Sequence, residues 1–446
     1  MNGLISKALS RGLDEVEVYS VKVRTISYSV AKDRISEGSM GESRSIGITG
    51  VADKRLGSIH VNAEEYDPDR ILDKLVSIVK SSPQDPRWRG FPSQVRKPSE
   101  AICLDKSIEL MDEERFADLI EAVINFFKDP VLRKGVNKAE VAEGSFIAQF
   151  EEISVANSNG LEAHSHCTRA SIWLTLSIEK NGYHSDKSFA YVRRKLDLTE
   201  LTKLASEEGE RALLFFNSTP IESGSYEVIL TPEVTSLILS YALIPAFSAL
   251  DFMEKRSPLT GKLGEEILNP QVKLVDNPLL PLEAFTRPFD DEGVGTTAKT
   301  LVDKGVVQNL LHNFYTASYF QTEPGGNGFR SSPGSRPLPR RTNVILEPGK
   351  GGPLDFSRDV RNGLIVYEVI GYWMSNPYTG NTKVTVTHGL LVKNGEIVKP
   401  VKGVVIAGNV YEWLGEKLVA IGSDRESHQG VITPSVWIRG VNVAGE

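Results

Sequence analysis

A long uncharged run constrains the fold of this chain more than any other feature. The segment TSLILSYALIPAFSALDF, residues 235–252, has no charged side chain before Asp251. Its composition predicts a helix, and a helix that is apolar all round must be buried. The run is short for a membrane span and contains Pro245 and several hydroxyls, so we expect it inside a soluble domain. Such a helix is chemically silent, and any reactive groups must come from elsewhere in the chain.

The totals exclude several classes of protein. A chain of 446 residues is too long for one simple core, so two or three domains are expected. Its net charge of -7 and pI of about 5.7 argue against direct contact with nucleic acid. Two cysteines, Cys103 and Cys167, do not make a disulfide framework and fit a reducing cytosol. The N-terminus lacks the apolar core of a signal peptide, so we expect a cytoplasmic protein with no membrane segment.

The first half of the chain repeats one order of predicted elements. A short helix over 2–12 precedes strands with period-two alternation, and a helix follows Asp67 and Pro68. A Pro-rich stretch over 81–98 reads as a linker. A second helix, strands with an NSNG hairpin signal and a closing helix then follow. This order indicates a duplicated α+β unit.

The last part of the chain has a different character. After a strand and the uncharged helix comes an irregular region rich in Gly and Pro, followed by strands and short turns with an Asn394-Gly395 hairpin signal. We therefore expect an α+β fold: duplicated helix–strands–helix units, then a mostly antiparallel β domain with one buried helix. The expected boundaries are 1–95 and 96–220 for the two units and 221–446 for the β domain.

Histidine is the first candidate for metal chemistry. His164 and His166 would share one strand face, next to Cys167, and two such residues can bind one ion. An exposed face of an antiparallel strand explains the same pattern, and we favour that interpretation. No carboxylate at helical spacing accompanies them, so the general base of a metallopeptidase is missing.

Two further stretches could contact a ligand. RPFDDEG contains Asp290, Asp291 and Glu292, which could hold a hard cation or form a solvated turn, the interpretation we favour. The glycine- and arginine-rich loop TEPGGNGFRSSPGSRPLPRR could close over a cleft that receives peptide ends, or be a plain surface loop. The residues we nominate for weak contact with substrate or partner are Gly326, Asn327, Arg330 and Asp290.

Several phrases, in one order, resemble the TldD/PmbA family, the so-called modulators of DNA gyrase. They include RPFDDEGVGTTAKTLVDKGVVQNLL, PRRTNVILEPG, GLIVYEVIGYWMSNPYTG, PVKGVVIAGNVYEWL and the closing GVNVAG. GITGVADKRLGSIHV and NSNGLEA extend the likeness into the first two segments. The resemblance thus covers nearly the whole chain. It implies a cytosolic two-protein peptidase that degrades small or unfolded peptides.

The resemblance also says where a zinc site belongs. TldD-type members bind zinc through a helix with H-E-x-x-x-H and a later cysteine, whereas PmbA-type members, also called TldE, do not. Counting back from LTGKLGEEI places the motif at Ser240–Pro245, or one residue later, and alignment on VKNGEI places the cysteine at Val386. Side chains such as Leu, Ile, Ala and Pro have no lone pair for zinc. We therefore expect no cofactor and no catalytic or metal-binding residue in this chain.

The sequence thus predicts a non-catalytic PmbA/TldE-type subunit that forms a dimer with a zinc-carrying TldD-type chain and acts on peptides. Two alternatives stay open. One is an intrinsic metallopeptidase with ligands from His164, His166 or the acids near Asp290. The other is a non-enzymatic regulator of DNA gyrase, which the acidic charge balance does not favour.

Overall fold

The N-terminal half has the predicted duplicated order of elements. The computed structural model describes residues 1–62, 67–93 and 96–446, so Gln94 and Val95 of the expected linker lie outside it. The first unit contains α1 (Asn2–Leu9), β1 (Glu15–Ala31), β2 (Arg34–Ala52), β3 (Arg55–Asn62) and α2 (Pro68–Ser81). The second contains α3 (Lys106–Glu109), α4 (Glu113–Arg133), β4 (Lys138–Asn157), β5 (Glu162–Lys180), β6 (Tyr183–Arg193), α5 (Leu198–Ala212) and η1 (Leu213–Phe215).

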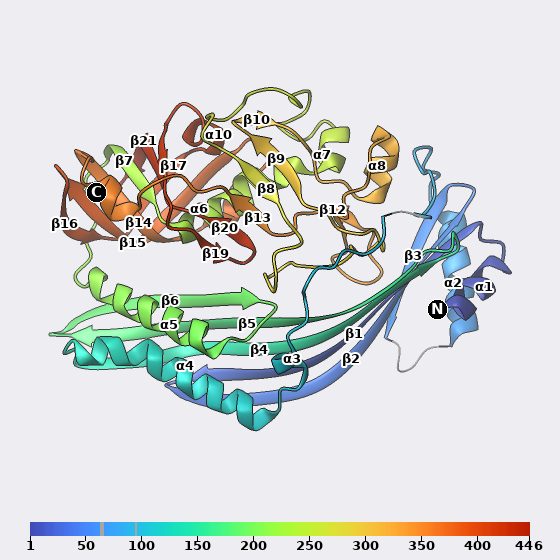
Figure 1. The fold of residues 1–446 in the computed structure, drawn as a ribbon, viewed down its shortest axis with the longest axis horizontal. Coiled ribbons are helices and arrows are strands. Elements are labelled where there is room, and N and C mark those ends of the chain that lie inside the picture. Colours follow the sequence, from blue (N-terminus) through green and yellow to red (C-terminus); the bar gives the residue numbers. More distant parts are fainter. Residues whose placement is uncertain (63–66, 94–95) are drawn as a thin grey trace.

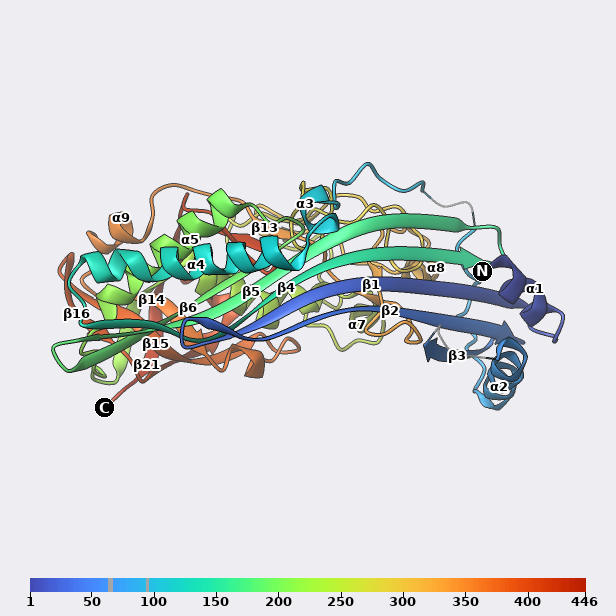
Figure 2. The ribbon, with the colours of Figure 1, turned by 90° about the horizontal axis from the view of Figure 1, so that it is seen from below.

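The two units share a single antiparallel sheet. Its strand order is β3-β2-β1-β4-β5-β6, with β1 pairing both β2 and β4. The register runs from Glu17 opposite Asn157 to Ala31 opposite Glu143, along nearly the full length of β1. The result is a long curved sheet with α1 and α2 at one end and α4 and α5 toward the other (Figures 1 and 2).

The two faces of this sheet have different neighbours. Side chains on one face, such as Ile26, Phe146 and Ile172, pack with the apolar side of α4. Alternate side chains point the other way, and there Tyr19 and Ile153 pack with Phe289 of the C-terminal part. The C-terminal domain therefore covers the face that the helices leave open (Figure 1).

The C-terminal domain is mostly antiparallel, as expected. One sheet combines β7 (Gly224–Leu230), β14 (Asn362–Ile370), β15 (Asn381–Lys393), β16 (Glu396–Val401), β17 (Val404–Asn409), β18 (Leu418–Ile421) and β21 (Val436–Ala444). A second combines β8 (Leu274–Asp276), β9 (Lys299–Asp303), β10 (Val306–Val307), β13 (Val344–Leu346), β19 (Glu426–His428) and β20 (Val431–Thr433). A short pair joins β11 (Gly328–Phe329) to β12 (Leu338–Pro339). The predicted hairpin is confirmed, because Asn394 and Gly395, both with positive φ, turn the chain between β15 and β16.

The uncharged run is a series of short helical turns rather than one helix. It comprises α6 (Pro232–Ile238), the π-helical turn η2 (Leu239–Leu243), the 3₁₀ turn η3 (Ile244–Phe247) and α7 (Ala249–Met253). The other helical segments are α8 (Phe314–Phe320), α9 (Pro353–Ser357), η4 (Tyr372–Met374) and α10 (Val410–Trp413). Within the described ranges, none of the helices has the length and apolar character needed to cross a bilayer.

The two cysteines correct the sequence-based expectation. Cys103 and Cys167 form a disulfide, with Cα atoms 4.9 Å apart. It ties the segment before α3 to β5, where Thr168 N also donates a hydrogen bond to Cys103 O at 2.8 Å. The pairing was invisible in the sequence because the two residues are 64 positions apart. The two cysteines therefore no longer support the expectation of a reducing compartment.

Candidate functional site

The positions aligned with a zinc motif fall in two consecutive helical turns. Ser240 lies in the π-helical turn η2, and Pro245, which has no backbone N–H to donate, lies in the 3₁₀ turn η3. Both line a groove with a volume of about 400 Å³, together with Ile244, Ser248 and Leu311. In the alternative alignment, one residue later, Ala246 is buried. The geometry therefore favours the Ser240–Pro245 alignment.

These residues do not fit a zinc ion. Zinc in proteins takes thiolate, imidazole or carboxylate ligands, and Ser240, Tyr241 and Pro245 offer none of them. Val386, aligned with the cysteine, is fully buried on β15 in the same apolar cluster as Leu243 and Ile244. The aligned positions therefore give this groove no set of side chains that could bind a zinc ion.

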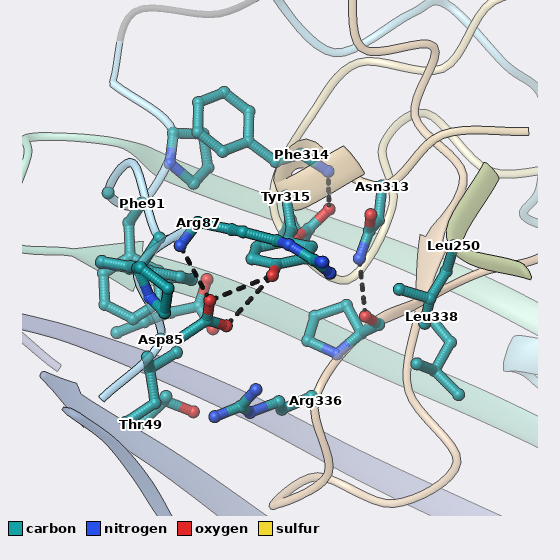
Figure 3. Close-up of a pocket in the computed structure, with 18 of the residues that line it drawn as sticks. Thr49, Asp85, Arg87, Phe91, Leu250, Asn313, Phe314, Tyr315, Arg336 and Leu338 are labelled. Atoms are coloured by element: carbon teal, nitrogen blue, oxygen red, sulfur yellow. Dashed lines mark hydrogen bonds between the residues drawn. The ribbon is translucent and has the colours of Figure 1, made fainter. Parts of the chain in front are cut away.

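A larger pocket continues from this groove. It has a volume of about 630 Å³ and lies between the first unit, the segment 83–92 and the C-terminal domain. Leu250 and Leu338 line both the pocket and the groove, so the two adjoin. Figure 3 shows Arg87, Phe91, Tyr315 and Arg336 around the pocket. A pocket of this size with apolar walls and a few polar groups is suited to a small ligand or a peptide segment.

Aromatic rings form one wall of the pocket. Trp88 stacks on Tyr315 with ring centroids 6.4 Å apart and meets Phe91 edge-on at 5.1 Å. The Tyr315 hydroxyl donates to Asp85, at 3.2 Å from Oδ1 and 3.1 Å from Oδ2 (Figure 3). These contacts tie the segment 83–92 to α8 and fix the wall of the pocket.

The acidic turn is buried, which corrects the favoured prediction of a solvated turn. Asp290, Asp291 and Glu292 are 1%, 4% and 7% exposed. Asp290 Oδ1 accepts hydrogen bonds from the backbone of Glu292 and Val294, both at 3.0 Å, and Oδ2 accepts one from Gly328 at 2.8 Å. Burial raises the pKa of Asp290 to about 7. The turn is thus an internal support for the glycine-rich loop.

Ion pairs fix the rest of this acidic region. Asp291 pairs with Arg287 at 2.9 Å and accepts a hydrogen bond from Tyr19 at 3.1 Å. Glu17, 2% exposed, pairs with Arg330, whose guanidinium also lies 5.3 Å from the Tyr19 ring centroid. The positive charges of Arg287 and Arg330 therefore compensate Asp291 and Glu17, which allows these two carboxylates to be buried.

The nominated loop residues face inward. Asn327 is fully buried, and its amide donates to Asp276 and to the Arg340 carbonyl, both at 2.9 Å. Gly326, with φ of 71°, leaves no room for a side chain, because a Cβ would lie 2.7 Å from Thr296 Cα. Contact of Gly326, Asn327, Arg330 and Asp290 with a substrate or partner stays a prediction. In the described part of the chain their neighbours Glu17 and Glu292 line the pocket instead.

His164 and His166 lie on β5 and line neither the groove nor the pocket. His164 and His166 Nε2 atoms are 2.9 Å apart, and Ser154 Oγ lies 2.8 Å from His164 Nδ1. Both rings are exposed, as expected for an open strand face. Within residues 1–62, 67–93 and 96–446, no three His, Cys, Asp or Glu side chains are grouped closely enough to hold a metal ion.

Comparison with known proteins places the chain in a family. Residues 16–81, 106–215 and 223–445 match the models of PmbA/TldA metallopeptidase domain 1, central domain and C-terminal domain. An uncharacterised protein of Methanocaldococcus jannaschii is 27% identical over 96% of this chain and 95% of its own length. A metalloprotease TldD homolog of Haemophilus influenzae is 22% identical, with 94% and 88% covered.

A solved structure has the same fold over its full length. TldE from Thermococcus kodakarensis superimposes with a TM-score of 0.88 and 26% identity, covering 100% of both chains. The likeness therefore extends to the long shared sheet and to the C-terminal domain. Matched by three domain models in succession, the chain belongs to the PmbA/TldD family of metallopeptidases.

Proposed function

We propose that this chain is the PmbA/TldE-type subunit of a two-chain peptidase and that the zinc is carried by a TldD-type partner. The observation that carries the proposal is the groove beside η2 and η3, which Ser240 and Pro245 line at the aligned positions although neither side chain is a zinc ligand. A zinc-bound water needs a nitrogen, sulfur or carboxylate donor set around the ion. The likeness to TldE supports the assignment to this type.

The subunit's role is to enclose and position a peptide. The groove and the pocket adjoin, so an extended peptide could lie along both, and edge strands of the C-terminal sheets could pair with its backbone. Enclosure by two chains would exclude bulk water, while the partner's zinc would supply the water that hydrolyses the peptide bond, and it would slow the release of the peptide. We place the complex in the cytosol on the strength of the family resemblance.

The test uses the purified chain with and without a TldD-type chain from the same cell. We expect the lone chain to have no zinc and no peptidase activity on an unstructured labelled peptide. We expect the mixture to form a dimer by light scattering and to cleave the peptide until a chelator is added. Chelator-sensitive activity of the lone chain would establish the intrinsic metallopeptidase instead, and His164→Ala with His166→Ala would then locate its ligands.

A gyrase regulator is the second alternative. A pull-down from the native cell that recovers gyrase without a TldD-type chain would favour it over the peptidase subunit. The net charge of -7 argues against a mechanism through DNA contact. Alkylation of free thiols followed by mass spectrometry of the native protein tests the proposed cytosolic location: free thiols at Cys103 and Cys167 would support it, and the intact disulfide described above would argue against it.

A further inference from the structure

The wall between the acidic turn and β1 contains more negative than positive side chains. Arg287 pairs with Asp291 and Arg330 pairs with Glu17. These two ion pairs leave the carboxyl groups of Asp290 and Glu292 without a cationic partner among the described residues. Backbone donors compensate Asp290, which accepts three hydrogen bonds from N–H groups.

Glu292 is less well compensated and faces the pocket. It is 7% exposed and lines the cavity, and its Oε2 accepts one hydrogen bond, from Phe314 N at 2.7 Å. Among the described residues, Oε1 has neither a hydrogen-bond donor nor a cation. On its other side Glu292 packs against Gly328, where a Cβ would lie 2.1 Å from Oε2, so a residue with a side chain at this position would displace the carboxyl group.

The charges around Glu292 favour a proton on it when the pocket is empty. Burial, followed by the negative charges of Asp290 and Glu17, raises its pKa well above the ordinary value, against the effects of Phe314 N–H and Arg330. A buried acid in this state can exchange its proton for a cation that brings its own hydrogen-bond donors. Such a ligand restores the charge balance of the wall.

The rest of the pocket suits an organic cation on a peptide. Trp88, Phe91 and Tyr315 line the pocket, and aromatic rings attract cations; Asp85 adds a second carboxylate. Arg87 and Arg336 also line the pocket, but both side chains are exposed to water, which screens their charge. They lie at the open side, where a peptide's carbonyl groups or carboxylate would follow the buried cation.

We propose that this pocket binds the positively charged group of a peptide, with Glu292 as its anionic partner. The group is an ammonium or guanidinium, supplied by the peptide's N-terminus or by a lysine or arginine side chain. The inference rests on the proposed function in taking the ligand to be a peptide. It adds a charge preference that the family assignment does not contain.

The experiment measures peptide binding to the full chain by fluorescence anisotropy, with the label at the peptide's C-terminus. Four versions of one short lysine-containing peptide are compared: unmodified, N-acetylated, lysine replaced by norleucine, and both changes together. We expect one single change to weaken binding about tenfold or more, because a charge-assisted hydrogen bond is lost, and this identifies the source of the cation. Equal affinity for all four versions, or no binding, would overturn the inference.

Two variants assign the effect to Glu292. Glu292→Gln keeps the shape of the side chain and should abolish the discrimination between the four peptides. Glu254→Gln makes the same change at an exposed residue of the same pocket, paired with Arg256, and should retain it. Thermal unfolding of both variants verifies that they are folded. Discrimination that survives in Glu292→Gln would contradict the assignment.

Two more measurements complete the test. Calorimetry in buffers of different ionisation enthalpy should show release of about one proton on binding, since the carboxyl must lose its proton to pair with a cation. Assembly with the TldD-type chain is measured separately. Normal assembly without charge-dependent binding would sink this inference alone, and charge-dependent binding without assembly would sink the proposed subunit role alone.

Discussion

The helical turns α6 to η3 and the acidic turn at Asp290–Glu292 solve opposite problems in one continuous cleft. The first exposes Ser240, Tyr241 and Pro245 to solvent or groove but gives them nothing that binds a metal. The second buries its ionisable groups: Asp291 and Glu17 are in ion pairs, whereas Asp290 and Glu292 have no cationic partner among the described residues. The comparison shows that the exposure of a segment does not determine whether its side chains can bind a metal or carry a charge. Four predictions test this contrast, beginning with the largest effect.

Installing donors in the helical turns should create a metal site. In the variant Ser240→His, Tyr241→Glu, Pro245→His and Val386→Cys, we expect about one zinc ion per chain, against none in the parent. The measurement is elemental analysis after dialysis, with circular dichroism to verify the fold. Keeping Val386 while changing the other three gives the matched control, which should bind zinc more weakly. A folded variant that takes up no zinc would show that these positions are not the counterpart of the motif.

Removing the cation from the acidic wall should destabilise the protein strongly. Arg330→Ala leaves Glu17 buried without its partner, so the free energy of unfolding should fall by about 3–5 kcal/mol. Urea denaturation measures the change. The control is Arg358→Ala, whose pair with Asp355 is 76% and 62% exposed and should matter by less than about 1 kcal/mol. Similar losses in both variants would contradict the contrast between buried and exposed charges.

The acidic turn should also make stability depend on pH. The pKa of Asp290 is raised to about 7 in the folded protein, so the folded state holds a proton that the unfolded state loses at lower pH. Its stabilising effect is therefore full at pH below 3.8, the ordinary value, and is lost as the pH rises to about 7. Asp290→Asn, which cannot titrate, should flatten this part of the stability curve. An unchanged slope between pH 4 and 7 would assign the dependence to other groups.

The smallest effect is expected at Pro245. A proline inside a regular helix costs ~3 kcal/mol, but here the chain has already changed to a 3₁₀ turn. Pro245→Ala should therefore lower the free energy of unfolding by only about 0.4–1 kcal/mol, through the greater freedom of the unfolded chain. Thermal unfolding measures it. A gain of several kcal/mol would mean that the proline strains the segment instead of fitting it.

Local pattern was enough to predict much of the fold. The hairpin at Asn394-Gly395, the duplicated unit and the antiparallel C-terminal domain all follow from signals within a few residues of one another. The alignment of Ser240–Pro245 with a zinc motif also rests on sequence phrases, and it stays a prediction. What could not be read from them was the π-helical turn, because a spacing of five residues does not match the ordinary helical period.

Long-range partners account for the errors. The turn at Asp290–Glu292 looks solvated because its neighbours in sequence are polar, but Tyr19 and Glu17, which bury it, come from the other end of the chain. Trp88 and Tyr315 form the pocket wall from equally distant segments. The single disulfide escaped notice for the same reason. The aromatic residues of segment 83–92 are a sequence signal for the pocket. The sequence alone, however, does not show that this segment packs against Tyr315.

The pairing of β1 on both sides has a consequence for how the protein is made. β1 ends at Ala31, whereas the strand that covers its second edge begins only at Lys138. While the ribosome synthesises the intervening chain, that edge has unpaired backbone groups and can attract other nascent chains. We expect ribosome-associated chaperones to bind nascent chains that are stalled before Lys138. They should release chains that are stalled far enough beyond Asn157 for β4 to have left the ribosome. Crosslinking of the stalled chains measures this difference.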